Sequence, residues 1–478
     1  MKALFIACAI VLAGISVLAV QTLPKRRSQV PLIYWGTDPN PARGPQTALF
    51  EQWLLDKGYP PVDLEVDSHN RGLMKVIIQS VNGVGSELID YGGSQLRAYV
   101  AAGVLMDVTK LAQRHDFGLD RTYAAISEDI IIDGRQYGFP CNVTARPLTV
   151  NRALLQRESL PLPKFDWNWQ EFLEWALTVR KLDDAGNTVR YAVMPFDIEA
   201  IWLTNGGTKF NETLTRCVLD SPRVEEATRY YYDLMFKHRV MPTPVDIDSM
   251  GARGLYGGSG LHFLGNELVL AVMIGRYGMI RLRSFPDFAP DVALTPHKRM
   301  PLQFTTARAA AVNAGAKNPQ QAARFLEFLA DDPYNRLIVH DADALPPNPN
   351  IARDPAFLTP KAHPKEHGAH EKWFRAAAEY GVGREFSPFV NAAVVERIIR
   401  KYTSGIESEA ISIDGALRGM TDEINEELHR TIEHDSALRE RFERAAARQN
   451  ALDRMKAEPI PADQIDNVVL RRLAESSP

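Results

Sequence analysis

Patterns typical of strands and helices alternate through residues 30–102, and this alternation constrains the fold more than any other feature of the sequence. The strand-like stretches are short and apolar, whereas the helix-like stretches carry apolar residues at helical spacing and end at glycines. Strands are expected at residues 30–35, 62–66 and 88–91, and helices at 47–57, 73–81 and from 95 toward 102. The pattern predicts an α/β fold with a mostly parallel sheet and helices on both faces.

A second α/β passage follows, and the chain becomes mostly helical from Trp373 onward. Strands are expected at residues 137–142, 147–150, 268–274 and 307–313, and helices at 167–180, within 218–238, and at 318–330. The tail at residues 431–455 is dense in Arg, Glu and Ala, which is typical of a solvated helix with mixed charges. A helix that docks on a partner is the alternative interpretation of this tail.

Length and charge limit the classes of protein to consider. The chain has 478 residues, enough for two to four domains or a pair of large lobes. The formal net charge is −4, and the 55 basic residues are spread along the chain, so we expect no nucleic-acid partner. Only one segment is long and apolar enough to span a membrane, which excludes a multi-pass membrane protein.

That segment covers residues 3–20, which carry no charge and follow Lys2. It is either a signal peptide cleaved after Ala19 or an uncleaved membrane anchor, and both interpretations place the bulk of the chain in a periplasmic or other extracytoplasmic space. Cys141 and Cys217 are the cysteines beyond this leader. They form either a disulfide, which an oxidising compartment allows, or two separate thiols.

Several motifs resemble, in order and spacing, those of the extracellular solute-binding proteins of ABC importers. The resemblance is to the carbohydrate-binding family that includes maltose-binding protein. It covers residues 30–430, and its motifs are YWG at 34–36, LIDY at 88–91, AAGVLMDVT at 101–109, DGRQYGFP at 133–140, NRALL at 151–155, NGG at 205–207, KNPQQAARFLEFL at 317–329 and ALP at 344–346. Two motifs depart from the family pattern, because Ser86-Glu87 replaces an expected Asp and Arg276-Tyr277 stands where the family has Trp.

The resemblance implies a two-lobe, periplasmic-binding-protein-like fold with a hinge and a central cleft. The expected organisation is residues 1–28 as signal peptide or membrane anchor, 29–140 plus 300–350 as lobe one, 141–299 plus 351–430 as lobe two, and 431–478 as a charged helical extension. The implied protein is not an enzyme and uses no cofactor or metal. It is a monomer that captures a small-molecule carbohydrate by lobe closure and delivers it to the ABC permease subunits in the membrane.

Candidate ligand-binding residues follow from the strand ends, since ligands of open α/β sheets bind beyond the carboxyl ends of the strands. Carbohydrates need hydrogen-bonding side chains and aromatic faces. Residues of these types lie at or after the expected strands or in turns: Trp35, Asp38, Tyr91, Ser94, Gln95, Asn142, Trp202, Asn205, Tyr256, Arg276 and Tyr277. Each has a structural alternative: the Trp side chains can be core, and Gln95 and Asn142 can cap turns.

Two other functions remain open at this stage. A membrane-tethered sensor or adaptor would use the long leader and the charged tail, and would pass its ligand to a receptor instead of a permease. A secreted carbohydrate-active enzyme would need a pair of carboxylates facing the cleft at catalytic separation, and the sequence contains no recognisable constellation of that kind.

Overall fold

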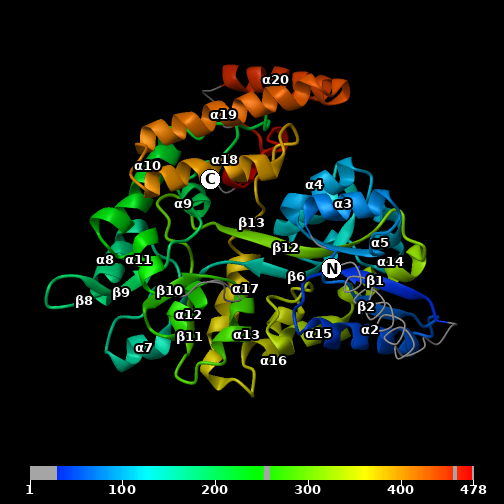
Figure 1. Ribbon diagram of the computed structural model, residues 1–478, viewed down its shortest axis with the longest axis horizontal. Helices are drawn as coiled ribbons and strands as arrows, with labels where there is room; N and C mark the ends of the chain where they lie inside the picture. Colours follow the sequence, from blue (N-terminus) through cyan, green and yellow to red (C-terminus); the bar gives the residue numbers. More distant parts are fainter. Residues whose placement is uncertain (1–29, 71, 252–258, 456–459, 476–478) are drawn as a thin grey trace, which may run out of the picture.

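The computed structural model describes residues 30–70, 72–251, 259–455 and 460–475, which form two lobes built on two β-sheets. Figure 1 shows lobe one on the right and lobe two on the left, with the long strands β6 and β12 between them. The predicted two-lobe α/β fold is confirmed. No helix formed by the described residues combines the length and the apolar character needed to cross a membrane.

The sheet of lobe one has the strand order β13-β12-β3-β1-β2, with β6 paired to the other edge of β12. The three strands nearest the N-terminus are parallel, whereas β12 runs antiparallel to both β3 and β6. The strands are β1 (Leu32–Gly36), β2 (Asp63–Val66), β3 (Leu88–Gly92), β6 (Gly138–Ala145), β12 (Gln303–Val312) and β13 (Gly381–Val382), and β4 (Ile131–Ile132) and β5 (Arg135–Gln136) form a separate hairpin.

The sheet of lobe two has the order β11-β7-β10-β9-β8. Here only β9 and β10 pair in parallel, and the other pairs are antiparallel. The strands are β7 (Leu148–Asn151), β8 (Lys181–Leu182), β9 (Thr188–Val193), β10 (Val269–Met273) and β11 (Pro290–Ala293). The predicted parallel pairing is confirmed for the strands of residues 30–102, β1, β2 and β3, whereas the sheet of lobe two is mostly antiparallel.

Helices cover both sheets, and their positions follow the predicted periodicity closely. In lobe one they are α2 (Arg43–Asp56), α3 (Leu73–Val81), α4 (Gly93–Ala101), α5 (Thr109–His115), α6 (Ser127–Ile130), α14 (Pro319–Ala330) and α15 (Asp332–Asp341). In lobe two they are α7 (Arg152–Arg157), α8 (Trp169–Val179), α9 (Ile198–Thr204), α10 (Pro222–Tyr232), α11 (Pro244–Ser249), α12 (Ser259–Gly265), α13 (Met279–Leu282), α18 (Ala392–Glu407) and α19 (Ile413–Glu433).

Helix α14 illustrates how the sequence fixes an element. Pro319 occupies the first turn, where its missing N–H costs no hydrogen bond. Ala322, Phe325, Leu326 and Leu329 then recur at helical spacing and are buried against β1 and α2. Burial of this apolar stripe holds the helix on one face of the sheet.

Three crossings between the lobes lie close to one another, and a further passage joins β13, on the lobe-one sheet, to α18 in lobe two. Strand β6 continues into β7, and β12 begins shortly after β11. The third crossing follows α15, where the backbone of Leu345 exchanges two hydrogen bonds with Val143 of β6, at 2.9 and 3.0 Å. Helices α16 (Pro355–Leu358) and α17 (Ala369–Ala378) follow this crossing, and α17 packs on strands of both sheets. The residue boundaries predicted for the two lobes remain a prediction.

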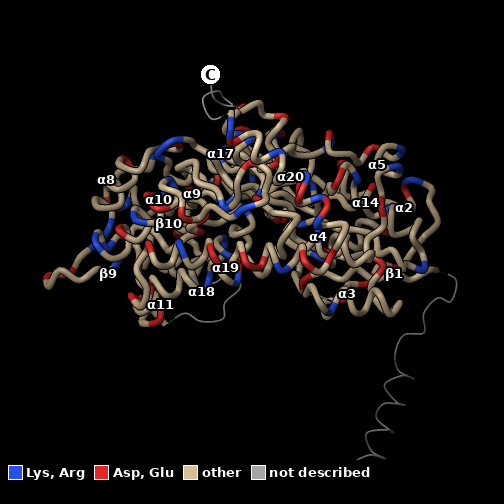
Figure 2. Tube along the Cα trace, turned by 90° about the horizontal axis from the view of Figure 1, so that it is seen from above, with Lys and Arg blue, Asp and Glu red and all other residues tan. Residues whose placement is uncertain are grey.

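The C-terminal tail folds back onto the molecule as α20 (Ser436–Arg454) and α21 (Val468–Glu475). Phe442 of α20 packs edge-on against Phe389, with ring centroids 5.1 Å apart. Figure 1 shows α20 beside α19 at the top of the molecule, and Figure 2 shows basic and acidic residues interspersed over the view from that side. Cys141 and Cys217 are both buried free thiols, so of the two alternatives the separate thiols are confirmed.

Candidate ligand-binding site

The carboxyl ends of β1 and β3 lie at the same edge of the lobe-one sheet because the two strands are parallel. This edge faces the crossings, and side chains from six segments converge on it. Arg308 of β12 lies opposite Gly92 at the end of β3 and opposite Asn142 of β6. The loop after β1 supplies Thr37 and Asp38. We call the resulting group of side chains the edge cluster; its members are Thr37, Asp38, Arg43, Asp90, Asn142, Arg308 and Asp343.

Two arginines organise the edge cluster. Arg43 donates to Asp38 Oδ1 from Nε at 2.9 Å, and its Nη1 donates to Asp343 Oδ2 at 2.9 Å. Arg308 donates from Nη1 to Asp90 Oδ2 at 2.5 Å, and its Nη2 lies 3.8 Å from Asp343 Oδ2. Asp343 thus lies between the two guanidinium groups.

The remaining members close the cluster around Asp343 and Asp90. Asn142 donates to Asp343 Oδ1 at 3.2 Å, and Thr37 donates to Asp90. The cluster counts three acidic and two basic side chains, so its formal charge is −1. Arg43 and Asp343 are almost completely buried, whereas 35% of the Asp38 side chain is exposed. The acidic group that reaches solvent is therefore Asp38, whose second oxygen can accept a hydrogen bond from a ligand hydroxyl.

Burial and charge act in opposite directions on this cluster. Burial alone raises the pKa of Asp343, but Arg308, Arg43 and the hydrogen bonds hold it below its ordinary value. Burial lowers the pKa of Arg308, yet the Asp90 carboxylate raises it well above its ordinary value. Asp343 and Arg308 therefore stay ionised at neutral pH. Arg308 Nε and Asp90 Oδ1 are buried without a hydrogen-bond partner among the described residues.

A pocket of 870 Å³ opens between the lobes. Asn40, Pro41 and Ala42 line it from lobe one, next to Arg43, and the end of α15 adds Asp341. Lobe two contributes α13, and the segment after the third crossing closes the remaining wall; the residues from these two parts are Ile280, Arg283, Ile351 and residues 354–363 in part. Its volume is that of sites for small molecules, and its walls come from both sides of the crossings.

The predicted residues of lobe one separate into core, cap and surface. Trp35 is 0% exposed and packs against Phe325 at 4.9 Å. Tyr91 is 2% exposed and lies edge-on to a neighbouring tyrosine. Gln95 caps α4 by accepting a hydrogen bond from the Gly92 N–H at 3.0 Å, and Ser94 is exposed. The two rings thus occupy the core, so a ligand would reach them only if the core opened.

The predicted residues of lobe two show a similar division. Trp202 is 2% exposed and donates to the Thr228 hydroxyl at 2.8 Å. Asn205 is fully buried and ends α9, where it donates to the Arg223 carbonyl. Both belong to the packing of lobe two. Tyr277 is partly buried beside the crossing strand β6, and Tyr256 lies outside the described residues.

Arg276 connects the segment after β10 to the end of α15 and to α17, and its guanidinium group is not available to a ligand. It is 2% exposed and lies three residues after the end of β10. Its guanidinium donates to the carbonyls of Ile338, Val339 and Ala344, at 3.2, 2.7 and 2.9 Å, and its Nε donates to His370 at 3.1 Å. It therefore caps the C-terminus of α15, where unpaired carbonyls and the helix dipole favour a cation.

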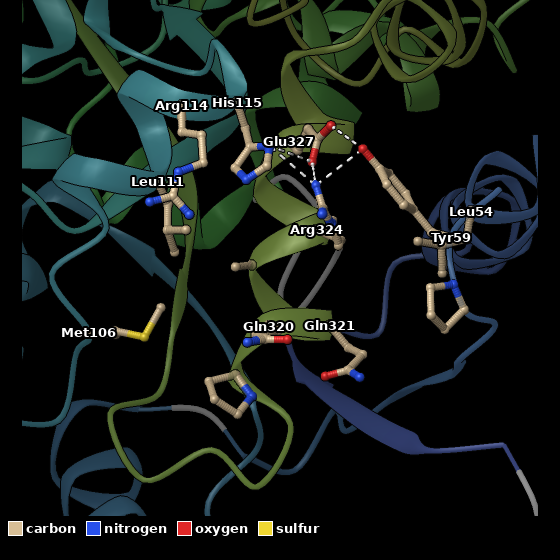
Figure 3. A pocket seen from close by; sticks show the side chains of 13 residues that line it. Leu54, Tyr59, Met106, Leu111, Arg114, His115, Gln320, Gln321, Arg324 and Glu327 are labelled. Carbon is tan, nitrogen blue, oxygen red and sulfur yellow. Dashed lines mark hydrogen bonds and ion pairs between the residues drawn. The ribbon is translucent and has the colours of Figure 1, made fainter. Parts of the chain in front are cut away.

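A second pocket, of 420 Å³, lies within lobe one between α2, α5 and α14 (Figure 3). Its polar groups already satisfy one another: Arg324 donates to Glu327 and to the Tyr59 hydroxyl, which in turn donates to Glu327 at 3.1 Å. The Arg324 guanidinium also lies 4.0 Å from the centroid of the Tyr59 ring. Since this pocket is confined to one lobe, lobe closure would not act on it.

Five members of the edge cluster were not among the residues predicted from the sequence: Thr37, Arg43, Asp90, Arg308 and Asp343. A signal for two of them was present, because Asp90 and Arg308 are single charges inside otherwise apolar strands. A charge in such a position is rarely buried without an opposite charge beside it. Their pairing was not deducible, since Arg308 and Asp90 are 218 positions apart.

The sequence matches the family model "Bacterial extracellular solute-binding protein" over residues 44–336. That range includes β2 to β12, the first half of α15, and Asp90, Asn142 and Arg308 of the edge cluster. No significant match to a curated protein sequence is found.

Solved structures of similar fold come from several bacteria. An ABC substrate-binding protein from Listeria monocytogenes in complex with cycloalternan is 18% identical, with a TM-score of 0.70 over 83% of this chain and 99% of that chain. The sugar-binding protein MalE from Xanthomonas citri is 12% identical, with a TM-score of 0.68 over 84% and 99%. The GacH receptor of Streptomyces glaucescens, solved unliganded and with acarbose, is 14% identical, with a TM-score of 0.67 over 84% and 99%.

Proposed function

Because this chain belongs to the bacterial extracellular solute-binding proteins, we propose that it captures a carbohydrate between its lobes and delivers it to the permease of an ABC importer. The proposal rests above all on the 870 Å³ pocket with walls from both lobes. A ligand that contacts both walls stabilises the closed arrangement, whereas the open one offers only half of the contacts. The permease would then recognise the closed lobes.

The ligand class is proposed on two grounds. Proteins of the same fold carry cycloalternan, tagatose and maltose in their structures. In this chain the exposed carboxylate of Asp38, beside the pocket residue Asn40, is suited to accept hydrogen bonds from hydroxyl groups. Among the described residues, Tyr277 is the one predicted aromatic side chain that is not fully buried, so stacking on a sugar ring would fall to Tyr277.

We also propose how the parts of the chain divide this task between them. Residues 29–140 plus 300–350 and 141–299 plus 351–430 act as the two moving lobes, and residues 1–28 direct export or anchor the chain outside the cytoplasm. The protein acts as a monomer and performs no covalent chemistry on its ligand.

Thermal unfolding of the chain in the presence of mono- and oligosaccharides and uronates tests the ligand class. A sugar at a hundredfold excess over its dissociation constant should stabilise the folded state by about 2.7 kcal/mol. Asp38→Ala should abolish most of that shift. If peptides or polyamines raise the melting temperature and no carbohydrate does, the proposed ligand class is wrong.

A further inference from the structure

The edge cluster has a property that its role in ligand contact does not require: each of the three crossings supplies one of its members. Asn142 lies on β6, Arg308 on β12, and Asp343 on the third crossing, directly after α15. Three of the segments that join the lobes therefore meet in a single network.

Asp343 occupies the centre of this network. One oxygen accepts from Asn142, and the other accepts from Arg43 at 2.9 Å and from Gln46 at 3.3 Å. Arg308 Nη2 lies 3.8 Å from that second oxygen. The Asp343 side chain is 5% exposed, so solvent screens these interactions poorly.

Arg43 connects Asp343 to the surface. Its Nε and Nη2 lie 2.9 and 2.8 Å from Asp38 Oδ1, a two-pronged contact that fixes the orientation of the carboxylate. The same guanidinium lies 5.5 Å from the centroid of the Trp35 ring, which limits its movement. A displacement of Asp343 is thus transmitted to Asp38 through one rigid, planar group.

We propose that Asp343 is a positioning residue that couples the orientation of the ligand-facing Asp38 loop to the angle between the lobes. This inference rests on the proposed function and concerns how the same site is regulated. When a ligand hydroxyl fixes Asp38, Arg43 and Asp343 are held in the geometry that favours closed crossings. Conversely, when the third crossing shifts, Asp38 loses its orientation and the ligand is released.

The test measures binding and closure separately. Spin labels on cysteines introduced at the exposed positions Asn82 in lobe one and Gln170 in lobe two report the distance between the lobes, and the native thiols are buried. Asp343→Asn keeps the shape of the side chain and removes its charge. In this variant the distance distribution without ligand should be broader than in the unsubstituted protein. Its affinity for the best sugar from the thermal screen should be at least tenfold lower.

Asp116→Asn is the matched control, because it removes the same charge from an exposed position of lobe one and should change neither quantity. Asp343→Glu restores the carboxylate and should recover part of both the affinity and the narrow distribution, which a purely structural defect would not show. Asn142→Ala removes only the hydrogen bond from β6 to Asp343, and it serves as the test variant if Asp343→Asn folds poorly. Its distance distribution should be broader than that of the unsubstituted protein, by less than in Asp343→Asn.

The possible results separate the two proposals. A protein that binds no carbohydrate contradicts the proposed function, whereas the ligand-free distance distributions still test the role of Asp343. If Asp343→Asn gives the same distribution as the unsubstituted protein, or binds the sugar within twofold of its affinity, Asp343 is not the coupling residue.

Discussion

At the residue scale, burial decides which chemically suitable side chains can take part in binding. Trp35 and Asp38 are three positions apart at the end of the same strand, and both residue types suit a sugar. Trp35 is 0% exposed, whereas 35% of the Asp38 side chain is accessible. A tryptophan surrounded on all sides contributes to stability through packing, and only an exposed group can exchange water for a ligand.

Trp35→Ala should therefore act on stability. We expect the free energy of unfolding to fall by about 3–5 kcal/mol, because the change leaves a cavity against Phe325. Tyr34→Ala is the matched control, since the neighbouring side chain is 40% exposed and should cost less than about 1 kcal/mol. Urea unfolding measures both. If Trp35→Ala lost sugar binding and kept its stability, Trp35 would be a ligand-binding residue and not a core residue.

Asp129 is a second residue whose surroundings determine its behaviour. It is 2% exposed on α6 and accepts a hydrogen bond from the Ala307 N–H of β12 at 2.5 Å. Burial raises its pKa to about 7, against the opposing effects of that hydrogen bond and Arg384, while Glu128 and Tyr91 are the acidic neighbours. Its folded pKa lies above the unfolded one, so the folded state keeps a proton that the unfolded chain releases from about pH 4 upward.

The free energy of unfolding should consequently decrease as the pH rises from about 4 to about 7, by at most about 1.4 kcal/mol per pH unit from this group. Asp129→Asn preserves the acceptor for Ala307 and removes the titration. The variant should show a flatter profile in urea unfolding between pH 5 and pH 8, with its gain over the unsubstituted protein greatest at the higher pH. Parallel profiles for the two proteins would refute the assignment.

At the element scale, the helix ends depend on contacts that come from distant segments. The C-terminus of α15 receives Arg276 from the segment after β10, and this guanidinium also lies 4.7 Å from the centroid of the Phe357 ring. The sequence did not predict this helix, which ends at Ala342 in a left-handed backbone conformation, φ 59°. The cation that satisfies its last carbonyls lies more than 60 positions away.

Arg276→Ala should destabilise the protein by about 3–5 kcal/mol, because buried carbonyls of Ile338, Val339 and Ala344 lose their donors. Arg276→Lys should recover only part of this loss, since an ammonium group lacks the planar fork of donors. Hydrogen exchange at α15 and urea unfolding measure the effect. Arg281→Ala, at an exposed position of α13, is the control and should stay within about 1 kcal/mol.

At the scale of the whole molecule, the C-terminal tail is part of the fold. The predicted solvated helix is present as α20, but the tail beyond it also fills a buried site. Asn467 donates to the Glu385 carboxylate at 2.5 Å and to the Phe210 carbonyl at 2.8 Å, and it is 0% exposed. Burial raises the pKa of Glu385 against the effect of Lys209, so each remaining hydrogen bond to this carboxylate matters.

Asn467→Ala should therefore lower the free energy of unfolding by about 1–3 kcal/mol. Arg441→Ala is its counterpart on the same tail, because it removes the exposed ion pair between α20 and Asp133 of the β4–β5 turn. Exposed pairs contribute about 0–1 kcal/mol, so this variant should unfold almost like the unsubstituted protein. Equal losses in both variants would mean that the tail is held by its surface charges.

The sequence by itself determined the α/β class and many of the elements, because periodicity, capping residues and glycine-terminated turns are local properties. It indicated the family through the order and spacing of its motifs. It also predicted correctly that the loop after β1 contributes a polar side chain, Asp38, to the candidate site. The rings proposed to stack on a sugar were a different matter: Trp35, Tyr91 and Trp202 lie where the sequence places them, on strand ends and helices, but in the core.

Only the tertiary structure decided which side chains meet. Arg43 and Asp343 are 300 positions apart, and they come together because three crossings bring both ends of lobe one to a single sheet edge. Exposure and ion pairing depend on every segment packed around a residue, whereas hydrophobic patterning reports only on its own element. For this reason the scaffold could be deduced from the order of the residues, and the edge cluster could not.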